Sequence, residues 1–216
     1  MNRPMLQVAL DHTDLPSALA AARILAPEVD VLEAGTILCF AEGAGAVAAL
    51  RAAHPRHVLL ADLKAADAGS VLADMVFSRG ATWMTVICNA PLATMKSALE
   101  VAKRHQGDVQ VELYGDWTFE LAAEWMRAGL RQVVFHRGRD AQAAGKTWDE
   151  TDIATIRKLA GMGLEVSVTG GLEPEDVARF RGIPVKCFIA GRSLYGAADP
   201  AAAAKAFRAA IEREWP

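Results

Sequence analysis

Charged and polar side chains follow short apolar segments throughout the sequence, at the points where those segments end. A single acid or threonine at such a point can simply cap the next helix. Several like charges gathered in one cleft, however, are unfavourable unless a cation or a catalytic task compensates for them. The pattern therefore predicts a reactive pocket if the fold brings these ends together. The side chains concerned are Asp11, Glu33, Asp62, Lys64, Glu112 and His136.

The densest cluster is the segment Ala61-Asp62-Leu63-Lys64-Ala65-Ala66-Asp67. Asp62 and Lys64 are two residues apart, so on an extended strand their side chains face the same way. Asp67 follows in the loop or in the first turn of a helix. An exposed set of ion pairs, worth less than ~1 kcal/mol, is the alternative. It fits poorly, because the cluster directly follows the apolar run 58–61.

Two glycine-containing segments near the end of the chain predict a phosphate site. Thr169-Gly170-Gly171 and Gly191-Arg192 each follow an apolar run. Glycine allows backbone N–H groups to approach an anion closely, and a following helix N-terminus favours negative charge. Arg192 can add charge and paired hydrogen bonds. Plain turn chemistry is the alternative, but two such loops favour phosphate binding.

Eight short apolar runs, rich in β-branched residues, supply the elements that must position these groups. Continuous apolar runs of this length are typical of parallel strands buried on both faces. The predicted strands are Leu6 to Leu10, Val29 to Leu32, Val58 to Ala61, Trp83 to Ile87, Val109 to Leu113, Gln132 to Phe135, Leu164 to Val168 and Lys186 to Ala190.

Segments with helical periodicity lie between the strands, and local signals predict where they begin and end. We expect Asp14, Thr118 and Thr151 to cap helix starts. Glycines at 80, 107, 129 and 163 are placed to end helices. The predicted helices are Leu15 to Ala26, Gly43 to His54, Gly69 to Arg79, Ala93 to His105, Phe119 to Ala128, Thr151 to Gly161, Glu173 to Phe180 and Pro200 to Trp215.

Eight alternating strands and helices are compatible with two architectures, an open doubly wound sheet and a closed barrel. The count of eight favours a single (β/α)8 TIM barrel over residues 1–216. In such a barrel the carboxyl ends of all strands converge on one face, where the active site lies. The polar residues described above would then line one pocket.

The composition of the chain argues against some classes of binding partner. The formal net charge of −3 gives no reason to expect nucleic acid or an anionic membrane. No apolar stretch approaches the ~18–20 residues of a membrane span. We find no signal-peptide cleavage pattern at the start of the sequence. The three cysteines lack metal-ligand spacing and are typical of free thiols in a reducing compartment, so we expect a cytoplasmic protein.

Taken together, the sequence resembles the 3-keto-L-gulonate 6-phosphate decarboxylases, a family within the orotidine monophosphate decarboxylase superfamily of barrels. The resemblance runs nearly end to end. The D-x-K-x-x-D of Asp62, Lys64 and Asp67 identifies only the superfamily, whereas the segment 136–145 is far more specific. The segments that carry the resemblance are Leu6 to Asp11, Glu33-Ala34-Gly35-Thr36, Asp62 to Asp67, Trp83 to Ile87, His136 to Gly145 and both glycine loops.

The resemblance implies a Mg²⁺-dependent homodimer whose active sites are shared across the interface. It assigns Glu33 and Asp62 as metal ligands. Lys64 would contact the reacting oxygens. Asp67 would reach into the site of the partner subunit, and would count among the catalytic residues with Lys64.

The remaining roles also follow from the resemblance. Asp11 and Glu112 would position substrate hydroxyl groups or the lysine, and His136 and Arg139 would govern protonation. The phosphate end of the substrate would be held by residues of the last two loops, namely Thr169, Gly170, Gly171, Gly191 and Arg192.

The implied reaction is loss of CO₂ from 3-keto-L-gulonate 6-phosphate, through an enediolate, to give L-xylulose 5-phosphate. An aldolase of the superfamily, D-arabino-hex-3-ulose 6-phosphate synthase, is the nearest alternative, because it would add formaldehyde to a similar intermediate. Arg139, Thr169 and Arg192 favour the decarboxylase. Less favoured by the sequence are a metal-free nucleotide decarboxylase, an epimerase-like barrel with histidine ligands and a non-catalytic sugar-phosphate-binding protein.

Overall fold

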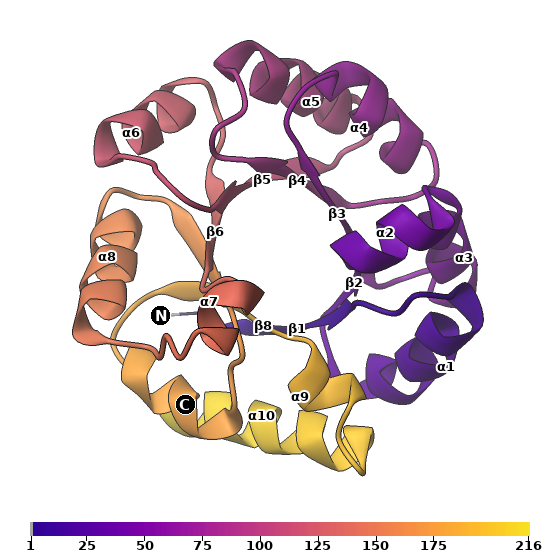
Figure 1. Ribbon diagram of the computed structural model, residues 1–216, viewed down its shortest axis with the longest axis vertical. Helices are drawn as coiled ribbons and strands as arrows, with labels where there is room; N and C mark the ends of the chain where they lie inside the picture. Colours follow the sequence, from indigo (N-terminus) through magenta and orange to yellow (C-terminus); the bar gives the residue numbers. More distant parts are fainter. Residues whose placement is uncertain (1) are drawn as a thin grey trace.

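Eight parallel strands close into a barrel in the computed structural model, which describes residues 2–216 (Figure 1). Each strand pairs with the next along the chain, and β8 pairs with β1. The predicted (β/α)8 barrel is therefore confirmed. The strands are β1 (Met5–Leu10), β2 (Val31–Ala34), β3 (Val58–Ala65), β4 (Trp83–Ile87), β5 (Asp108–Leu113), β6 (Gln132–His136), β7 (Glu165–Thr169) and β8 (Val185–Ala190).

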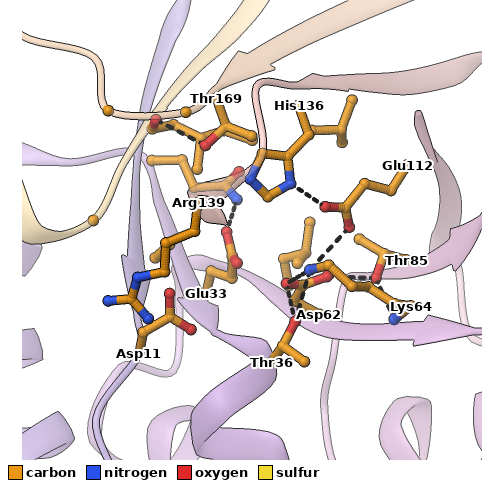
Figure 2. Close-up of a pocket in the computed structure, with 18 of the residues that line it drawn as sticks. Asp11, Glu33, Thr36, Asp62, Lys64, Thr85, Glu112, His136, Arg139 and Thr169 are labelled. Carbon is orange, nitrogen blue, oxygen red and sulfur yellow. Dashed lines mark hydrogen bonds and ion pairs between the residues drawn. The ribbon is translucent and has the colours of Figure 1, made fainter. Parts of the chain in front are cut away.

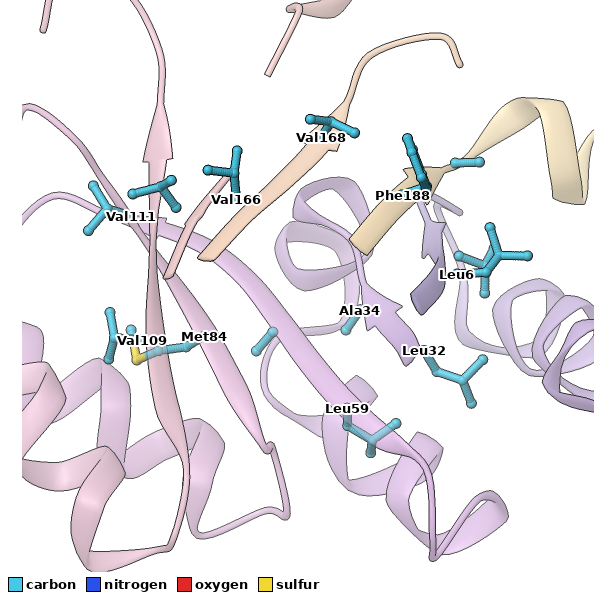
Figure 3. Packing of buried hydrophobic residues seen from close by; sticks show 14 of the residues in the cluster. Leu6, Leu32, Ala34, Leu59, Met84, Val109, Val111, Val166, Val168 and Phe188 are labelled. Atoms are coloured by element: carbon cyan, nitrogen blue, oxygen red, sulfur yellow. The ribbon is translucent and has the colours of Figure 1, made fainter. Parts of the chain in front are cut away.

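The alternation of side chains along each strand separates two groups of buried residues. Leu6, Val8 and Leu10 of β1 belong to the larger apolar cluster, which also contains residues of the surrounding helices. Figure 3 shows Leu6 beside strand residues of the same cluster, such as Phe188. Gln7 and Ala9 lie between the three β1 residues in the sequence and line the pocket in the barrel. Because successive side chains of a strand point to opposite faces, the outward set holds the helices and the inward set builds the site.

Helices surround the barrel, and most of them match the predicted segments. The helices are α1 (Leu15–Leu25), α2 (Thr36–Glu42), α3 (Gly45–Ala53), α4 (Gly69–Phe77), α5 (Leu92–Arg104), α6 (Phe119–Arg127), α7 (Arg139–Ala143), α8 (Glu150–Gly161), α9 (Arg192–Tyr195) and α10 (Pro200–Glu214), with 3₁₀ helices η1 (Ala26–Glu28) and η2 (Pro174–Phe180).

One predicted helix differs in type, and some helices were not predicted. The helix predicted from Gly43 to His54 is confirmed as α3, but it is preceded by the unpredicted helix α2, which ends at Glu42 and is followed by Gly43 with a φ of +60°. The segment 173–180 is a 3₁₀ helix rather than an α-helix. The short helices α7 and α9 were also not predicted, because four or five residues carry too little periodicity to be recognised.

The predicted helix starts are confirmed at two positions and wrong at the third. Asp14 accepts a hydrogen bond from the Ser17 amide at 2.8 Å, and Thr118 accepts one from the Leu121 amide at 3.2 Å. Thr151 lies inside α8. Asp149 caps this helix instead, because its carboxylate and that of Asp152 each accept a backbone hydrogen bond from the other residue.

Among residues 2–216, no single helix is long and apolar enough to cross a membrane. Helices α2 and α3 meet the length and composition criteria only when taken together, and they are bent by 109° relative to each other.

Candidate active site

A cavity of about 650 Å³ opens at the carboxyl ends of the strands (Figure 2). It brings together residues that are far apart in the sequence, and these include all but one of the predicted site residues. The predicted residues that line it are Asp11, Glu33, Asp62, Lys64, Glu112, His136, Arg139, Thr169, Gly170, Gly171, Gly191 and Arg192.

Asp67 is the predicted site residue that the cavity does not include. It lies between β3 and α4, and its side chain is exposed to solvent. Within one chain it is therefore separate from the other candidate residues, and the prediction that it acts in a partner's site stays a prediction.

The ammonium group of Lys64 lies at the centre of the cavity wall. Its Nζ forms an ion pair with Asp62, donates to Thr36 Oγ1 at 2.7 Å and lies 3.2 Å from Glu112 Oε2 (Figure 2). Burial alone would lower the pKa of Lys64, but the surrounding carboxylates outweigh burial and raise the pKa. Lys64 is therefore a fixed positive charge rather than a proton donor at neutral pH.

The backbone at Lys64 is irregular: β3 continues past the predicted end at Ala61 to Ala65, but it is not regularly extended there. Lys64 has a φ of +46°, and the pairing of β3 with β4 shifts register between Ala61 and Ala65. The Lys64 amide donates to Thr85 Oγ1 at 2.8 Å, which holds this bulge. The bulge re-aims a side chain beside the site. The expected proximity of Asp62 and Lys64 is confirmed, but a bulge rather than an extended strand produces it.

Asp62 is kept ionised by its neighbours. Its Oδ1 accepts a hydrogen bond from Thr85 Oγ1 at 2.7 Å, and its Oδ2 accepts one from Thr36 Oγ1 at 2.5 Å. Burial works against the charge, but Lys64 and these hydrogen bonds outweigh it and lower the pKa of Asp62. This carboxylate is therefore both charged and rigidly oriented.

For Glu33 the favourable effects of Lys64 and Gln7 do not outweigh burial and repulsion. Glu33 is buried, and its carboxylate accepts a hydrogen bond from the side chain of Gln7. Burial, together with repulsion from Asp62 and Asp11, raises the pKa of Glu33 well above its ordinary value. Burial also raises the pKa of Asp11. This side of the cavity therefore holds three carboxylates, Asp11, Glu33 and Asp62, beside two cations, Lys64 and Arg139.

That excess of carboxylates suits a hard divalent cation. Among residues 2–216, no group of three or more His, Cys, Asp or Glu side chains is arranged to hold a metal ion. Mg²⁺ commonly binds through one or two carboxylates, with water and substrate oxygens completing its shell. Glu33 and Asp62 provide two such carboxylates in one cavity, so the donor set fits Mg²⁺ when a substrate supplies further oxygens.

Glu112 and His136 form a second pair in the cavity, and Glu112 joins this pair to Lys64. His136 Nδ1 lies 2.5 Å from Glu112 Oε1, so this hydrogen bond leaves Nε2 as the ring nitrogen available to a ligand. The pKa of Glu112 is raised, chiefly by burial and also by Asp62, against the opposing effect of His136. Arg139, at the start of α7, extends toward Asp11 in the same cavity (Figure 2).

The glycine loop after β7 has a backbone that only glycine adopts easily. Gly170 and Gly171 have φ values of +122° and +59°. A Cβ atom on Gly170 would lie 2.3 Å from the carbonyl oxygen of Arg137. The Arg137 guanidinium donates to the Gly170 carbonyl at 2.7 and 3.0 Å, which fixes the loop against β6. Contacts within the chain therefore hold the loop in this conformation.

Sequence reasoning missed several residues of the site. Thr36 and Thr85 hold Asp62, Gln7 holds Glu33, and Tyr114 lies beside His136. Thr36 and Thr85 stand inside segments that carry the family resemblance, which was an available signal. Gln7 and Tyr114 could have been found from strand alternation, because residues two positions apart on a strand face the same way. Gln7 lies two positions before Ala9, and Tyr114 lies two positions after Glu112.

A cavity of this kind, at the carboxyl face of a closed parallel barrel, defines the chain as a (β/α)8-barrel enzyme. The sequence model of the family described as "Orotidine 5'-phosphate decarboxylase / HUMPS family" matches residues 4–207. The chain belongs to this family.

Individual relatives agree with the family match. The 3-keto-L-gulonate-6-phosphate decarboxylase UlaD of Escherichia coli is 53% identical over 215 residues, covering 100% of both chains. A crystal structure of KGPDC from Streptococcus mutans matches with a TM-score of 0.98 and 46% identity, covering 100% of both chains. A 3-hexulose-6-phosphate synthase structure matches with a TM-score of 0.90 and 36% identity, covering 96% of this chain and 99% of that one. The resemblance inferred from the sequence is confirmed, and so is the expectation of a carboxy-lyase.

The unbalanced charge of Glu33 predicts a pH-dependent cost in stability. Its folded-state pKa is raised above the unfolded value of about 4.3, so the charge destabilises the fold above that pH and not below it. Glu33→Gln removes the charge and keeps an oxygen for Gln7. In EDTA at pH 7, we expect the variant to unfold at a higher temperature than the wild type, and the difference to vanish as the pH falls to about 4.

Thermal unfolding followed by circular dichroism across this pH range measures the effect. Glu100→Gln is the matched control, because Glu100 lies on the exposed face of α5. A Glu33→Gln protein that is less stable than the wild type at pH 7 in EDTA would show that the Glu33 charge is compensated.

Proposed function

We propose that this chain decarboxylates 3-keto-L-gulonate 6-phosphate to L-xylulose 5-phosphate and CO₂, with Mg²⁺ as its cofactor. The observation that carries the proposal is the placement of Lys64, which is held by Asp62 and Glu112 inside a cavity that also contains two glycine loops. The full-length identity to a curated decarboxylase supports the choice of substrate.

The two ends of the cavity suit the two ends of this substrate. The phosphate would lie at the last two loops, where Gly171, Gly191 and Arg192 provide backbone amides and a guanidinium. The carboxylate and the keto group would then lie near Lys64 and Asp62. Binding of the phosphate group at a fixed place orients the reacting atoms of the substrate relative to Lys64.

The charged groups then act on the reaction itself. Loss of CO₂ breaks the bond between the carboxyl carbon and its neighbour and leaves an electron pair, which is delocalised onto the adjacent keto oxygen as an enediolate. Lys64, held in place by Asp62 and Glu112, stabilises negative charge that is greater in the transition state than in the ground state. Mg²⁺, when bound by Glu33 and Asp62, supplies further positive charge for the same oxygens.

The enediolate must next gain a proton on carbon. Nε2 of His136 is free to deliver one, because Nδ1 is engaged by Glu112. Arg139 lines the same cavity and can hold a water molecule for the same purpose. Proton delivery by His136, or by water between His136 and Arg139, completes the product.

An aldolase activity is the second candidate. The fold likeness to hexulose-phosphate synthases supports it, because the same enediolate chemistry would take up formaldehyde in place of a proton. We propose it as a side activity, since Arg139 and Thr169 favour the decarboxylase assignment.

Paired assays test the main proposal. We expect Mg²⁺-supported turnover of 3-keto-L-gulonate 6-phosphate with a kcat/KM well above that for D-ribulose 5-phosphate with formaldehyde. Treatment with EDTA should abolish turnover, and added Mg²⁺ should restore it. A higher kcat/KM in the formaldehyde assay would overturn the substrate assignment, and full activity in EDTA would overturn the metal assignment.

We further propose a homodimer in which Asp67 of each subunit completes the site of the other. Asp67 is exposed, stands outside its own cavity and lies only three residues from Lys64. A carboxylate this close in sequence to the catalytic lysine, yet outside the cavity, is readily explained if it serves a neighbouring site.

Subunit mixing tests the shared site. Lys64→Ala and Asp67→Ala proteins should each be inactive as pure dimers. After unfolding and refolding together in equal amounts, they should recover about one quarter of wild-type activity, because half of the dimers are mixed and one site in each mixed dimer is intact. Each variant refolded alone is the control. A mixture that stays inactive places Asp67 in the site of its own subunit.

A further inference from the structure

Tyr114 contacts His136, one of the two groups that the proposed mechanism uses to deliver the proton, and Gly138, the residue before the other group, Arg139. No role has so far been assigned to it. It follows β5 directly and lines the cavity. We infer that Tyr114 is a positioning residue that fixes His136 relative to the start of α7, and that residue 138 is a glycine because it must leave room for Tyr114. The inference rests on the proposed function in so far as His136 and Arg139 control protonation.

The first contact is with the imidazole ring. The ring centroids of Tyr114 and His136 are 5.5 Å apart, with an angle of 82° between the ring planes. This edge-to-face arrangement is a favourable aromatic geometry. Glu112 of β5, two residues before Tyr114, holds Nδ1 of His136. Two nearby residues of one segment therefore hold the imidazole, one by a hydrogen bond and the other by packing.

The second contact is with Gly138, which directly precedes α7. A Cβ atom on Gly138 would lie 2.4 Å from the Tyr114 hydroxyl oxygen and 2.9 Å from Cζ. Gly138 has φ −52° and ψ 150°, a conformation open to any L-residue. The backbone therefore does not require a glycine here. The space taken by the Tyr114 ring explains why a side chain is missing.

The backbone of Tyr114 is itself anchored. Its amide donates to Cys88 Sγ at 3.3 Å, and Cys88 Sγ donates to the Tyr114 carbonyl at 3.1 Å. Cys88 is buried at the end of β4. Tyr114 is thus held by the barrel at its backbone, while its ring meets His136 and its hydroxyl reaches the residue before Arg139. It can act as a spacer between the two.

Four variants test the spacer. Tyr114→Ala removes the ring, Gly138→Ala displaces it, Tyr114→Phe keeps it, and the double variant combines the two alanines. We expect each alanine variant to lower kcat by about 10- to 100-fold with little change in KM, because the phosphate anchor is untouched. Tyr114→Phe should retain most of kcat. The double variant should lose no more than Tyr114→Ala alone, because the clash at Gly138 disappears with the ring.

Turnover in D₂O supplies a readout that a purely structural role would leave unchanged. The carbon that loses CO₂ gains one deuterium, and the configuration of the resulting CHD group, read by NMR, reports the face of protonation. Tyr114→Ala and Gly138→Ala should shift the ratio of the two configurations in the same direction, whereas Tyr114→Phe should keep the wild-type ratio.

Three results would overturn the inference. Tyr114→Phe could lose as much kcat as Tyr114→Ala, which would assign the role to the hydroxyl. The losses from the two alanines could multiply in the double variant, which would make the sites independent. The deuterium ratio could stay unchanged in the alanine variants.

Failure of the proposed function is distinguishable from failure of this inference. A wild-type protein that does not turn over 3-keto-L-gulonate 6-phosphate contradicts the proposed function, and the same four proteins are then compared by thermal unfolding. Gly138→Ala should lower the unfolding midpoint in the wild-type background and not in the Tyr114→Ala background. Equal losses in both backgrounds overturn the pairing of Tyr114 with Gly138.

Discussion

The site depends on one charge interaction, the contact of the Lys64 ammonium group with the carboxylates of Asp62 and Glu112. Each of these carboxylates is costly to bury, and the lysine would be costly to bury without them. Together they keep Asp62 and Lys64 ionised although both are largely buried in the cavity wall. Glu33 remains in excess, and this excess is the physical basis for a divalent cation in the proposed mechanism.

The closed barrel makes this interaction possible. Asp62 and Lys64 come from β3 and Glu112 from β5, so neither strand alone could build the cluster. Closure places inward-facing residues of separate strands at the same level, and the outward-facing residues pack beneath the helices and hold the wall rigid. Fixed dipoles and charges of this kind need little reorganisation during a reaction, which is how a rigid scaffold contributes to rate.

Much of this arrangement could be predicted from the sequence. Eight apolar runs predicted the barrel, and the polar residues at their ends predicted the cavity. Both features follow from the regular alternation of strand and helix segments along the sequence. The bulge at Lys64 could not be predicted, because it depends on a hydrogen bond to Thr85 of the neighbouring strand. Helix α2 has no side-chain cap to mark its start, and Asp149 was overlooked although its capping box with Asp152 is a local sequence signal. The position of Tyr114 could have been found from strand alternation, but its close contact with Gly138, which follows the neighbouring strand, could not.

The central claim is that Lys64 stabilises the charge that develops when CO₂ leaves. The most direct test is the kcat/KM of the Lys64→Ala variant for 3-keto-L-gulonate 6-phosphate, with Lys96→Ala, an exposed lysine of α5, as the matched control. We predict a loss of at least about 10³-fold for Lys64→Ala and none for the control. A Lys64→Ala protein that decarboxylates the substrate at the wild-type rate would contradict the account.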